Sequence, residues 1–265
     1  MFVVNHTKTG IQEVDIAVST YLGYIASHTI LPEGNYAMAG GSFRCIFDKT
    51  RLRDLDIYIL GSFQEHSEVL NKFADGYAAI TTFCNPFAQF RLSTMPKHVI
   101  QEKQNNVFKG GTTEDIDPVE WDTVCIGNGL NVDVQLISYA FDSDFGNKIP
   151  AHIPKDAKYV DRSASCLNEI LNSFDITISK AGMEFIVKDR HIAITEIQLP
   201  PDFLIDIALK KLRLNSMDTG LPQQLCSLKR FHKLTKLGYE PDDNFFAEWD
   251  NRVKNNPHLM EFQYD

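Results

Sequence analysis

A pair of adjacent glycines followed by two alternating aspartates is the feature that most restricts how this chain can fold. An apolar run over 36–39 leads directly into Gly40 and Gly41, which open a short amphipathic segment. After twelve further residues, the stretch 54–60 alternates acidic and apolar positions, beginning Asp54-Leu-Asp-Ile. This pattern predicts a strand, a glycine turn, a helix over about 42–47, and a second strand over 54–60.

The glycine pair is suited to binding a phosphate group. Without a Cβ, the backbone N–H groups can approach an anion closely, and the start of a helix adds the positive end of its dipole. Ser42 offers a hydroxyl and Arg44 a fork of N–H donors to the same anion. We therefore expect Gly40, Gly41, Ser42 and Arg44 to hold a phosphate; a plain turn and a surface arginine are the alternatives.

Asp54 and Asp56 are suited to binding a divalent cation. Residues two apart on a strand point to one face, so the two carboxylates lie side by side and repel each other. A divalent cation relieves that repulsion. A phosphate cradle beside such a pair is what a magnesium–nucleotide site requires, whereas Asp-x-Asp alone is more often a solvated strand edge.

The order and spacing of these residues resemble the signature of the DNA polymerase beta superfamily of nucleotidyltransferases. The longer block, with Gly40, Gly41, Arg44, Asp54 and Asp56, is most similar to the head domain of CCA-adding enzymes and bacterial poly(A) polymerases. The similarity covers about residues 36–180, and its compact form is like that of phage and mobile-element members. The resemblance implies a two-metal mechanism with two Mg²⁺ ions, for which Mn²⁺ is an alternative.

The resemblance also implies a third carboxylate, for which the chain has two candidates. Asp133 lies between two valines on an expected strand, as the family's third acidic residue does. Asp175 lies in the run Phe174-Asp-Ile-Thr-Ile-Ser, which is similar to a family element that has two arginines where this chain has Ser173 and Phe174. We expect Asp54, Asp56 and Asp133 to be the metal ligands, with Asp175 as the rival catalytic residue.

A basic strip defined by Lys229, Arg230, Lys233 and Lys236 recurs at helical spacing near the C-terminus. It is the densest positive cluster in an acidic chain, and three interpretations stay open: a solvated helix face, a contact to the acceptor, or a contact to the triphosphate. The third interpretation is narrowly favoured, with Arg230 and Lys233 binding the nucleotide.

Composition limits the possible partners. The chain has 265 residues and a formal net charge of −9, so extensive non-specific binding of nucleic acid is not expected. Its five cysteines show no C-x-x-C spacing, which favours a reducing compartment. With no signal peptide and no run of about 18 apolar residues, we expect a cytoplasmic protein without a membrane partner.

The predicted fold is α+β: a small mixed β-sheet of the nucleotidyltransferase type with a helical C-terminal region. Strands are expected over 36–39, 54–60 and 78–84, as a hairpin of 121–127 with 130–137, and as a second hairpin around 188–190; no element is assigned to 85–118. Helices are expected over 9–30, 62–77, 161–174, 203–214 and 221–237, with a weaker segment from Phe245. The expected division is a catalytic domain over 1–195 and a helical region over 196–265.

The predicted function is template-independent transfer of a nucleoside monophosphate from an NTP, such as ATP, to an acceptor hydroxyl. An RNA 3′ end is slightly favoured as the acceptor over a protein or a small molecule. Two alternatives stay open: a regulator that nucleotidylates a protein, as antitoxin-type members of the superfamily do, and a non-catalytic binding or assembly protein that retains the fold.

Overall fold

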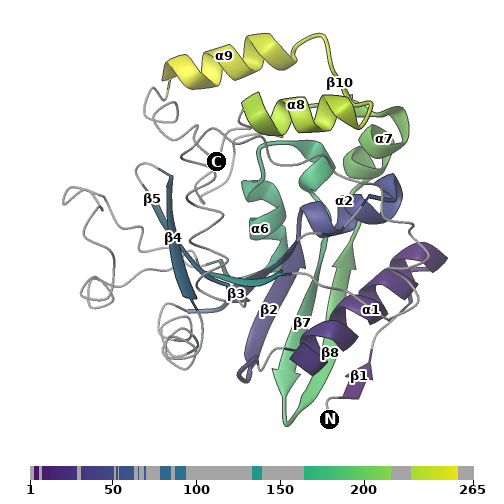
Figure 1. The fold of residues 1–265 in the computed structure, drawn as a ribbon, viewed down its shortest axis with the longest axis vertical. Helices are drawn as coiled ribbons and strands as arrows, with labels where there is room; N and C mark the ends of the chain where they lie inside the picture. Colours follow the sequence, from purple (N-terminus) through teal and green to yellow (C-terminus); the bar gives the residue numbers. More distant parts are fainter. Residues whose placement is uncertain are drawn as a thin grey trace.

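The fold is a mixed β-sheet between helices, with further helices gathered at one end (Figure 1). This computed structural model describes residues 3–5, 8–28, 31–50, 54–62, 78–84, 87–93, 133–138, 164–215 and 228–255, with positions 52, 65 and 69. None of the described helices has both the length and the apolar character needed to cross a membrane.

Eight described strands form the sheet, in the order β1-β8-β7-β2-β3-β6-β5-β4. Along the chain they are β1 (Val3–Asn5), β2 (Gly34–Ala39), β3 (Asp54–Leu60), β4 (Ala78–Cys84), β5 (Phe87–Ser93), β6 (Asp133–Ser138), β7 (Gly182–Lys188) and β8 (His191–Gln198). The pairs β1–β8 and β3–β6 are parallel and the other pairs are antiparallel. The predicted α+β class with a mixed sheet is therefore confirmed.

The two faces of the sheet are covered by different helices. Helices α1 (Gln12–His28) and α2 (Gly41–Asp48) lie on one face, where Leu55 and Ile57 of β3 are fully buried. Helix α6 (Leu167–Ser173) covers the other face, where Tyr58 and Leu60 pack. The alternation along β3 thus divides its side chains between two hydrophobic clusters, as a strand buried on both faces requires.

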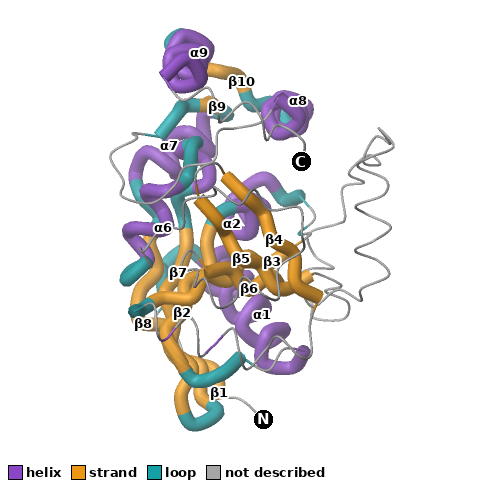
Figure 2. The backbone as a smooth tube through the Cα atoms, turned by 90° about the vertical axis from the view of Figure 1, so that its left-hand side faces the viewer, coloured by secondary structure: helices purple, strands orange, loops and turns teal. Residues whose placement is uncertain are grey.

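The C-terminal part of the chain packs on the end of this sandwich (Figure 2). Its elements are the 3-10 turn η2 (Thr177–Ser179), α7 (Pro201–Leu209), β9 (Lys211–Leu212), α8 (Leu228–Lys236), β10 (Glu240–Pro241) and α9 (Phe245–Asn255). Phe203, Leu234 and Tyr239 belong to the same buried cluster as α1 and α2. The predicted helical region therefore shares its core with the sheet, and the boundary near residue 195 stays a prediction.

Several predicted elements agree with the structure to within a residue or two. Strands 54–60 and 78–84 match β3 and β4, and the turn between β7 and β8 lies at Asp189 and Arg190, both with positive φ. The capping signal at Ser62 is also present, since its N–H donates to Glu65 Oε2 at 2.6 Å.

The expected hairpin of 121–127 with 130–137 does not describe β6. Over Gln135–Ile137 the two edges of β6 are already paired with β3 and β5, which leaves no edge there for a hairpin partner. Residues 121–132 lie outside the described residues. The unassigned stretch after residue 85 instead supplies β5.

Candidate functional site

Gly40 forms the turn between β2 and α2. Its φ of +89° lies in the region that favours glycine, and a Cβ at this position would lie 3.2 Å from Cζ of Phe174. The Gly40 N–H donates to the carbonyl of Ala181 at 3.0 Å, and the Gly40 carbonyl accepts from the N–H of Phe43 at 3.2 Å. The turn is therefore tied at its back to the segment before β7, and Gly41 is the first residue of α2.

Asp54 and Asp56 lie at the start of β3, beside this turn. Both are partly exposed, while the intervening Leu55 is fully buried on the opposite face. Because β2 and β3 are antiparallel with Met38 opposite Ile57, the C-terminal end of β2 and the start of β3 lie at the same end of this strand pair. The structure thus brings the predicted glycine turn and the predicted carboxylate pair together.

Position 133 begins β6 and lies directly opposite Asp54 in the parallel register of β3 and β6. Neighbouring register positions share a face of a sheet, so position 133 belongs to the face of Asp54 and Asp56. Among the side chains that the structure describes, no group of three His, Cys, Asp or Glu residues forms a metal cluster. The assignment of Asp133 as a ligand stays a prediction.

Ser42 and Arg44 point into the protein. Ser42 is buried, and within the described part of the chain its hydroxyl has no hydrogen-bond partner. Arg44 is 8% exposed, and its Nη1 lies 3.5 Å from Oδ2 of Asp48, four residues along α2. The guanidinium is thus engaged by a carboxylate of its own helix, and its phosphate contact stays a prediction.

Asp48, the last residue of α2, has a buried side chain whose contacts the sequence analysis does not identify. Its buried carboxylate accepts a hydrogen bond from the Tyr239 hydroxyl at 2.8 Å and also binds Lys210. Burial, followed by the charge of Asp48, raises the pKa of Tyr239. The contact of Asp48 with Arg44 could have been predicted from their i, i+4 spacing. The contacts with Lys210 and Tyr239 could not, because these residues are too distant along the chain for any local pattern.

The structure joins Asp175 and Arg230, to which the sequence analysis gives separate roles. The Asp175 side chain is 1% exposed, and its Oδ1 lies 3.2 Å from Nη1 of Arg230 on α8. Nη2 of Arg230 donates to the hydroxyl of Ser179 at 2.9 Å. Burial raises the pKa of Asp175, and the charge of Arg230 opposes that shift. Lys233 lies three residues further along α8, partly buried.

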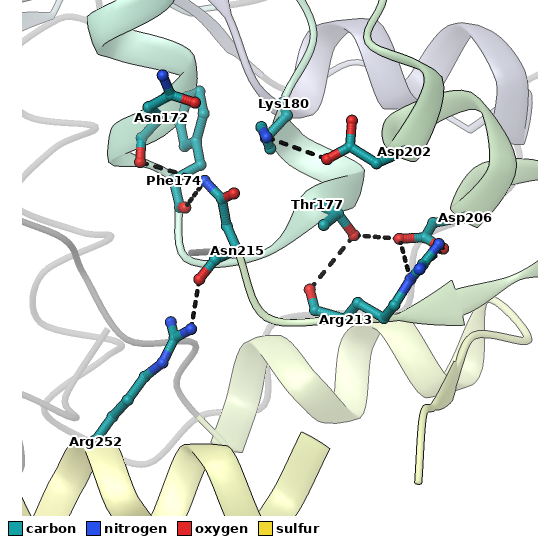
Figure 3. A network of polar contacts seen from close by, with 9 residues as sticks. All are labelled: Asn172, Phe174, Thr177, Lys180, Asp202, Asp206, Arg213, Asn215 and Arg252. Carbon is teal, nitrogen blue, oxygen red and sulfur yellow. Dashed lines mark hydrogen bonds and ion pairs between the residues drawn. The ribbon is translucent and has the colours of Figure 1, made fainter. Parts of the chain in front are cut away.

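A polar network holds the segment around Asp175 to the C-terminal region (Figure 3). Thr177 donates its hydroxyl proton to Asp206, which also binds Arg213 through its Nε at 2.8 and 2.9 Å. The side-chain amide of Asn215 donates to the carbonyls of Asn172 and Phe174, at 3.2 and 2.9 Å. The buried carboxylate of Asp206 is therefore paired and hydrogen-bonded, as burial of a charge requires.

Comparison with known proteins gives a likeness in structure only. No protein-family model matches the chain, and no curated protein matches its sequence. Solved structures that it resembles include a tRNA-processing enzyme and CCA-adding enzymes.

Three of these structures show the extent of the likeness. A CCA-adding enzyme in complex with CTP has 12% identity and a TM-score of 0.42, over 94% of this chain and 49% of that one. A tRNA-processing enzyme has 11% identity and a TM-score of 0.40, over 86% and 47%. The Thermotoga maritima CCA-adding enzyme complexed with tRNA has 11% and 0.36, over 96% and 46%. The chain spans about half the length of the structures that it resembles.

Proposed function

We propose that this chain transfers a nucleoside monophosphate from an NTP to an acceptor hydroxyl. One observation carries the proposal: a glycine turn at the start of a helix and a pair of partly exposed aspartates lie at the same end of two neighbouring strands. Backbone N–H groups at a helix start bind phosphate, and paired carboxylates bind a divalent cation. Together they are the components that nucleotidyl transfer requires.

The residues at this end of the two strands fit magnesium. Asp54 and Asp56 supply hard carboxylate oxygens on one face, and position 133 lies opposite Asp54 in the register. We propose that Asp54, Asp56 and Asp133 hold two Mg²⁺ ions, or Mn²⁺. Such ions stabilise the developing charge on the attacking and leaving oxygens of an in-line displacement. Asp175 fits this role less well, because its carboxylate is buried and paired with Arg230.

The protein groups then have distinct roles. The amide of Gly41, the first residue of α2, binds and orients the phosphates, aided by the dipole of α2. Gly40 donates its own N–H to Ala181, so its role is to shape the turn that presents this amide. Ser42 lies in the first turn of the same helix, and its hydroxyl is the side-chain hydrogen-bond donor that follows the glycine pair most closely in the sequence. Arg44 contributes positive charge near the turn while it binds Asp48, and Lys233 on α8 is a further candidate contact to the triphosphate.

The acceptor that we favour is an RNA 3′ end. Helix α8 carries the basic strip, and the positive charge of its lysines is suited to a phosphate backbone, while Arg230 binds Asp175. A protein or small-molecule hydroxyl would need no such strip. The proposal of an RNA acceptor is therefore supported by α8, whereas the proposal of the transfer reaction is supported by the residues at the ends of β2 and β3.

The test is incubation with each α-labelled NTP and Mg²⁺ in the presence of RNA, followed by separation of RNA, protein and small-molecule products. We expect label on RNA, and loss of label in Asp54→Asn and Asp56→Asn. Asp189→Asn is the matched control, because Asp189 is an exposed turn aspartate at the β7–β8 hairpin. Label on the protein itself would identify a protein-modifying enzyme, and NTP binding without transfer would identify a binding protein.

A further inference from the structure

The segment between α6 and β7 forms the back wall of the glycine turn. Ala181 accepts the hydrogen bond of the Gly40 N–H, and the tip of the Phe174 ring lies where a Gly40 side chain would be. The same ring packs edge-on against Tyr58, two residues after Asp56, with centroids 6.3 Å apart. A shift of Phe174 or Ala181 would therefore move the turn relative to the carboxylates.

This wall has little regular structure of its own. Between Phe174 and Ala181 it contains one 3-10 turn, η2, and a single bridge of Ile176 with Leu214. Its backbone groups form hydrogen bonds with the C-terminal region. The carbonyl of Asp175 accepts from the N–H of Asn215 at 2.7 Å, and the N–H of Thr177 donates to the carbonyl of Arg213 at 3.0 Å. Its position is therefore set by the elements that hold it.

Arg230 makes a charged contact with this segment. It reaches from α8 to Asp175 and to Ser179, which are both 1% exposed, and so spans both ends of η2. Within the described part of the chain, Oδ2 of Asp175 has no hydrogen-bond partner. Arg230 is in direct contact with the buried carboxylate and is the larger of two nearby positive charges, Arg252 being the smaller. Loss of the Arg230 contact is therefore expected to be strongly unfavourable, because it leaves a buried charge without its partner.

We infer that Arg230 is a positioning residue for the nucleotide site: it neutralises Asp175, binds Ser179, and thereby holds Phe174 and Ala181 against the glycine turn. Arg230 acts in this way through Asp175, and no contact with the triphosphate is needed. The inference rests on the proposed function only for its effect on catalysis. Its structural part, the coupling of α8 to the turn at Gly40, stands independently.

Hydrogen exchange of the full-length chain tests the structural part. In Arg230→Met, we expect exchange in peptides covering 38–44 and 174–181 to rise by about tenfold or more, because local opening becomes easier. Adding Asp175→Asn removes the uncompensated charge, so the double variant should regain most of the protection. Lys188→Met is the matched control: it removes one exposed positive charge at the β7–β8 hairpin and should leave both peptides unchanged.

Nucleotide kinetics on the same four proteins, and on Arg230→Lys, test the functional part. We expect Arg230→Met to lower kcat by about tenfold or more, and the double variant to recover most of it. Arg230→Lys, which keeps the charge, should lie near wild type. If Arg230 bound the triphosphate directly, adding Asp175→Asn would not rescue it, and KM for NTP would stay raised.

Two outcomes would overturn the inference. Unchanged exchange over 38–44 in Arg230→Met would show that α8 is not coupled to the turn. A double variant no better protected than Arg230→Met would show that neutralising Asp175 is not the cause. If the wild-type chain transferred no nucleotide at all, the proposed function would fail, while the exchange measurements would still decide the coupling.

Discussion

Gly40 combines a backbone conformation and a close contact that both exclude a side chain. Its φ is +89°, and Phe174 lies 3.2 Å from the position of a Cβ. We expect Gly40→Ala to lower the free energy of unfolding by about 1–3 kcal/mol, through strain and displacement of the ring. Gly41→Ala is the control, since a Cβ there meets nothing within 4 Å. Urea unfolding compares them, and equal losses would contradict the prediction.

Asp133 can be distinguished from Asp175 by the kind of kinetic loss that each substitution causes. The family resemblance implies that Asp133 helps to activate the attacking acceptor hydroxyl and contributes little to NTP binding. Asp133→Asn should therefore lower kcat by about 100-fold or more and leave the Kd for NTP within about threefold. Single-turnover rates and equilibrium binding measure the two quantities. A wild-type rate in this variant, with Asp175→Asn inactive, would identify Asp175 as the third carboxylate.

At the scale of the element, α2 is fixed at its C-terminal end by a carboxylate. Asp48 receives the Tyr239 hydroxyl at 2.8 Å, while Lys210 lies over the Tyr239 ring, 4.4 Å from its centroid. Tyr239→Phe keeps the ring and removes one hydrogen bond to a buried charge, so we expect a loss of about 1.5–3 kcal/mol in stability. Guanidinium unfolding measures this loss, and an unchanged midpoint would show that the hydroxyl contributes nothing to holding α2.

Helix α8 and the η2 turn are linked by an ion pair that depends on pH. Burial raises the pKa of Asp175, while Arg230 and Arg252 oppose the shift. The folded chain thus holds this proton more tightly than the unfolded chain, and the contribution of Asp175 to stability falls as pH rises above about 4. Because asparagine does not titrate, the stability of Asp175→Asn relative to wild type should increase from pH 4 to pH 7. Denaturation at several pH values checks this, and a constant difference would contradict it.

The elements that could be predicted from sequence are those with a local cause. Strand β3 follows from the alternation that begins at Asp54, and the β7–β8 turn follows from a polar pair between apolar runs. Strand β5 has a similar signal, since Ala88, Phe90 and Leu92 alternate with polar residues, but the prediction missed it. Helix α7 ends at Leu209 because Lys210 adopts a left-handed conformation. A glycine at this position would have predicted that end, but a lysine does not.

The contacts of the candidate site can likewise be divided into those that local sequence predicts and those that it does not. Gly40, Asp54 and Asp56 come together because β2 and β3 are neighbours joined by one short helix, so their spacing alone predicts the juxtaposition. Arg44–Asp48 lies within one helix. The contacts of Asp175 with Arg230 and of Asp48 with Lys210 join distant parts of the chain, and only the packing of the whole molecule creates them.

At the scale of the whole molecule, the sheet and the C-terminal region should fold as one unit. The described core is continuous across them, and Asp48, Thr177 and Asp175 each have at least one side-chain partner beyond residue 198. We expect a fragment of residues 1–198 to lack a cooperative unfolding transition, because it would leave buried charges unpaired. Calorimetry measures this, with co-expression of 199–265 as the rescue. A sharp transition in the fragment alone would show an independent domain.

The place of β2 in the sheet also bears on the order in which the protein can be built. One edge of β2 pairs with β3, which begins a few residues after α2. The other edge pairs with β7, so Ala39 cannot form its pair until Gly182 has been synthesised. During synthesis, that second edge stays open while the intervening residues are added. An unpaired edge is a template for aggregation, and pairing over so long a loop is slow. The strand that presents the glycine turn is therefore also one whose open edge is exposed to aggregation while the chain is still on the ribosome.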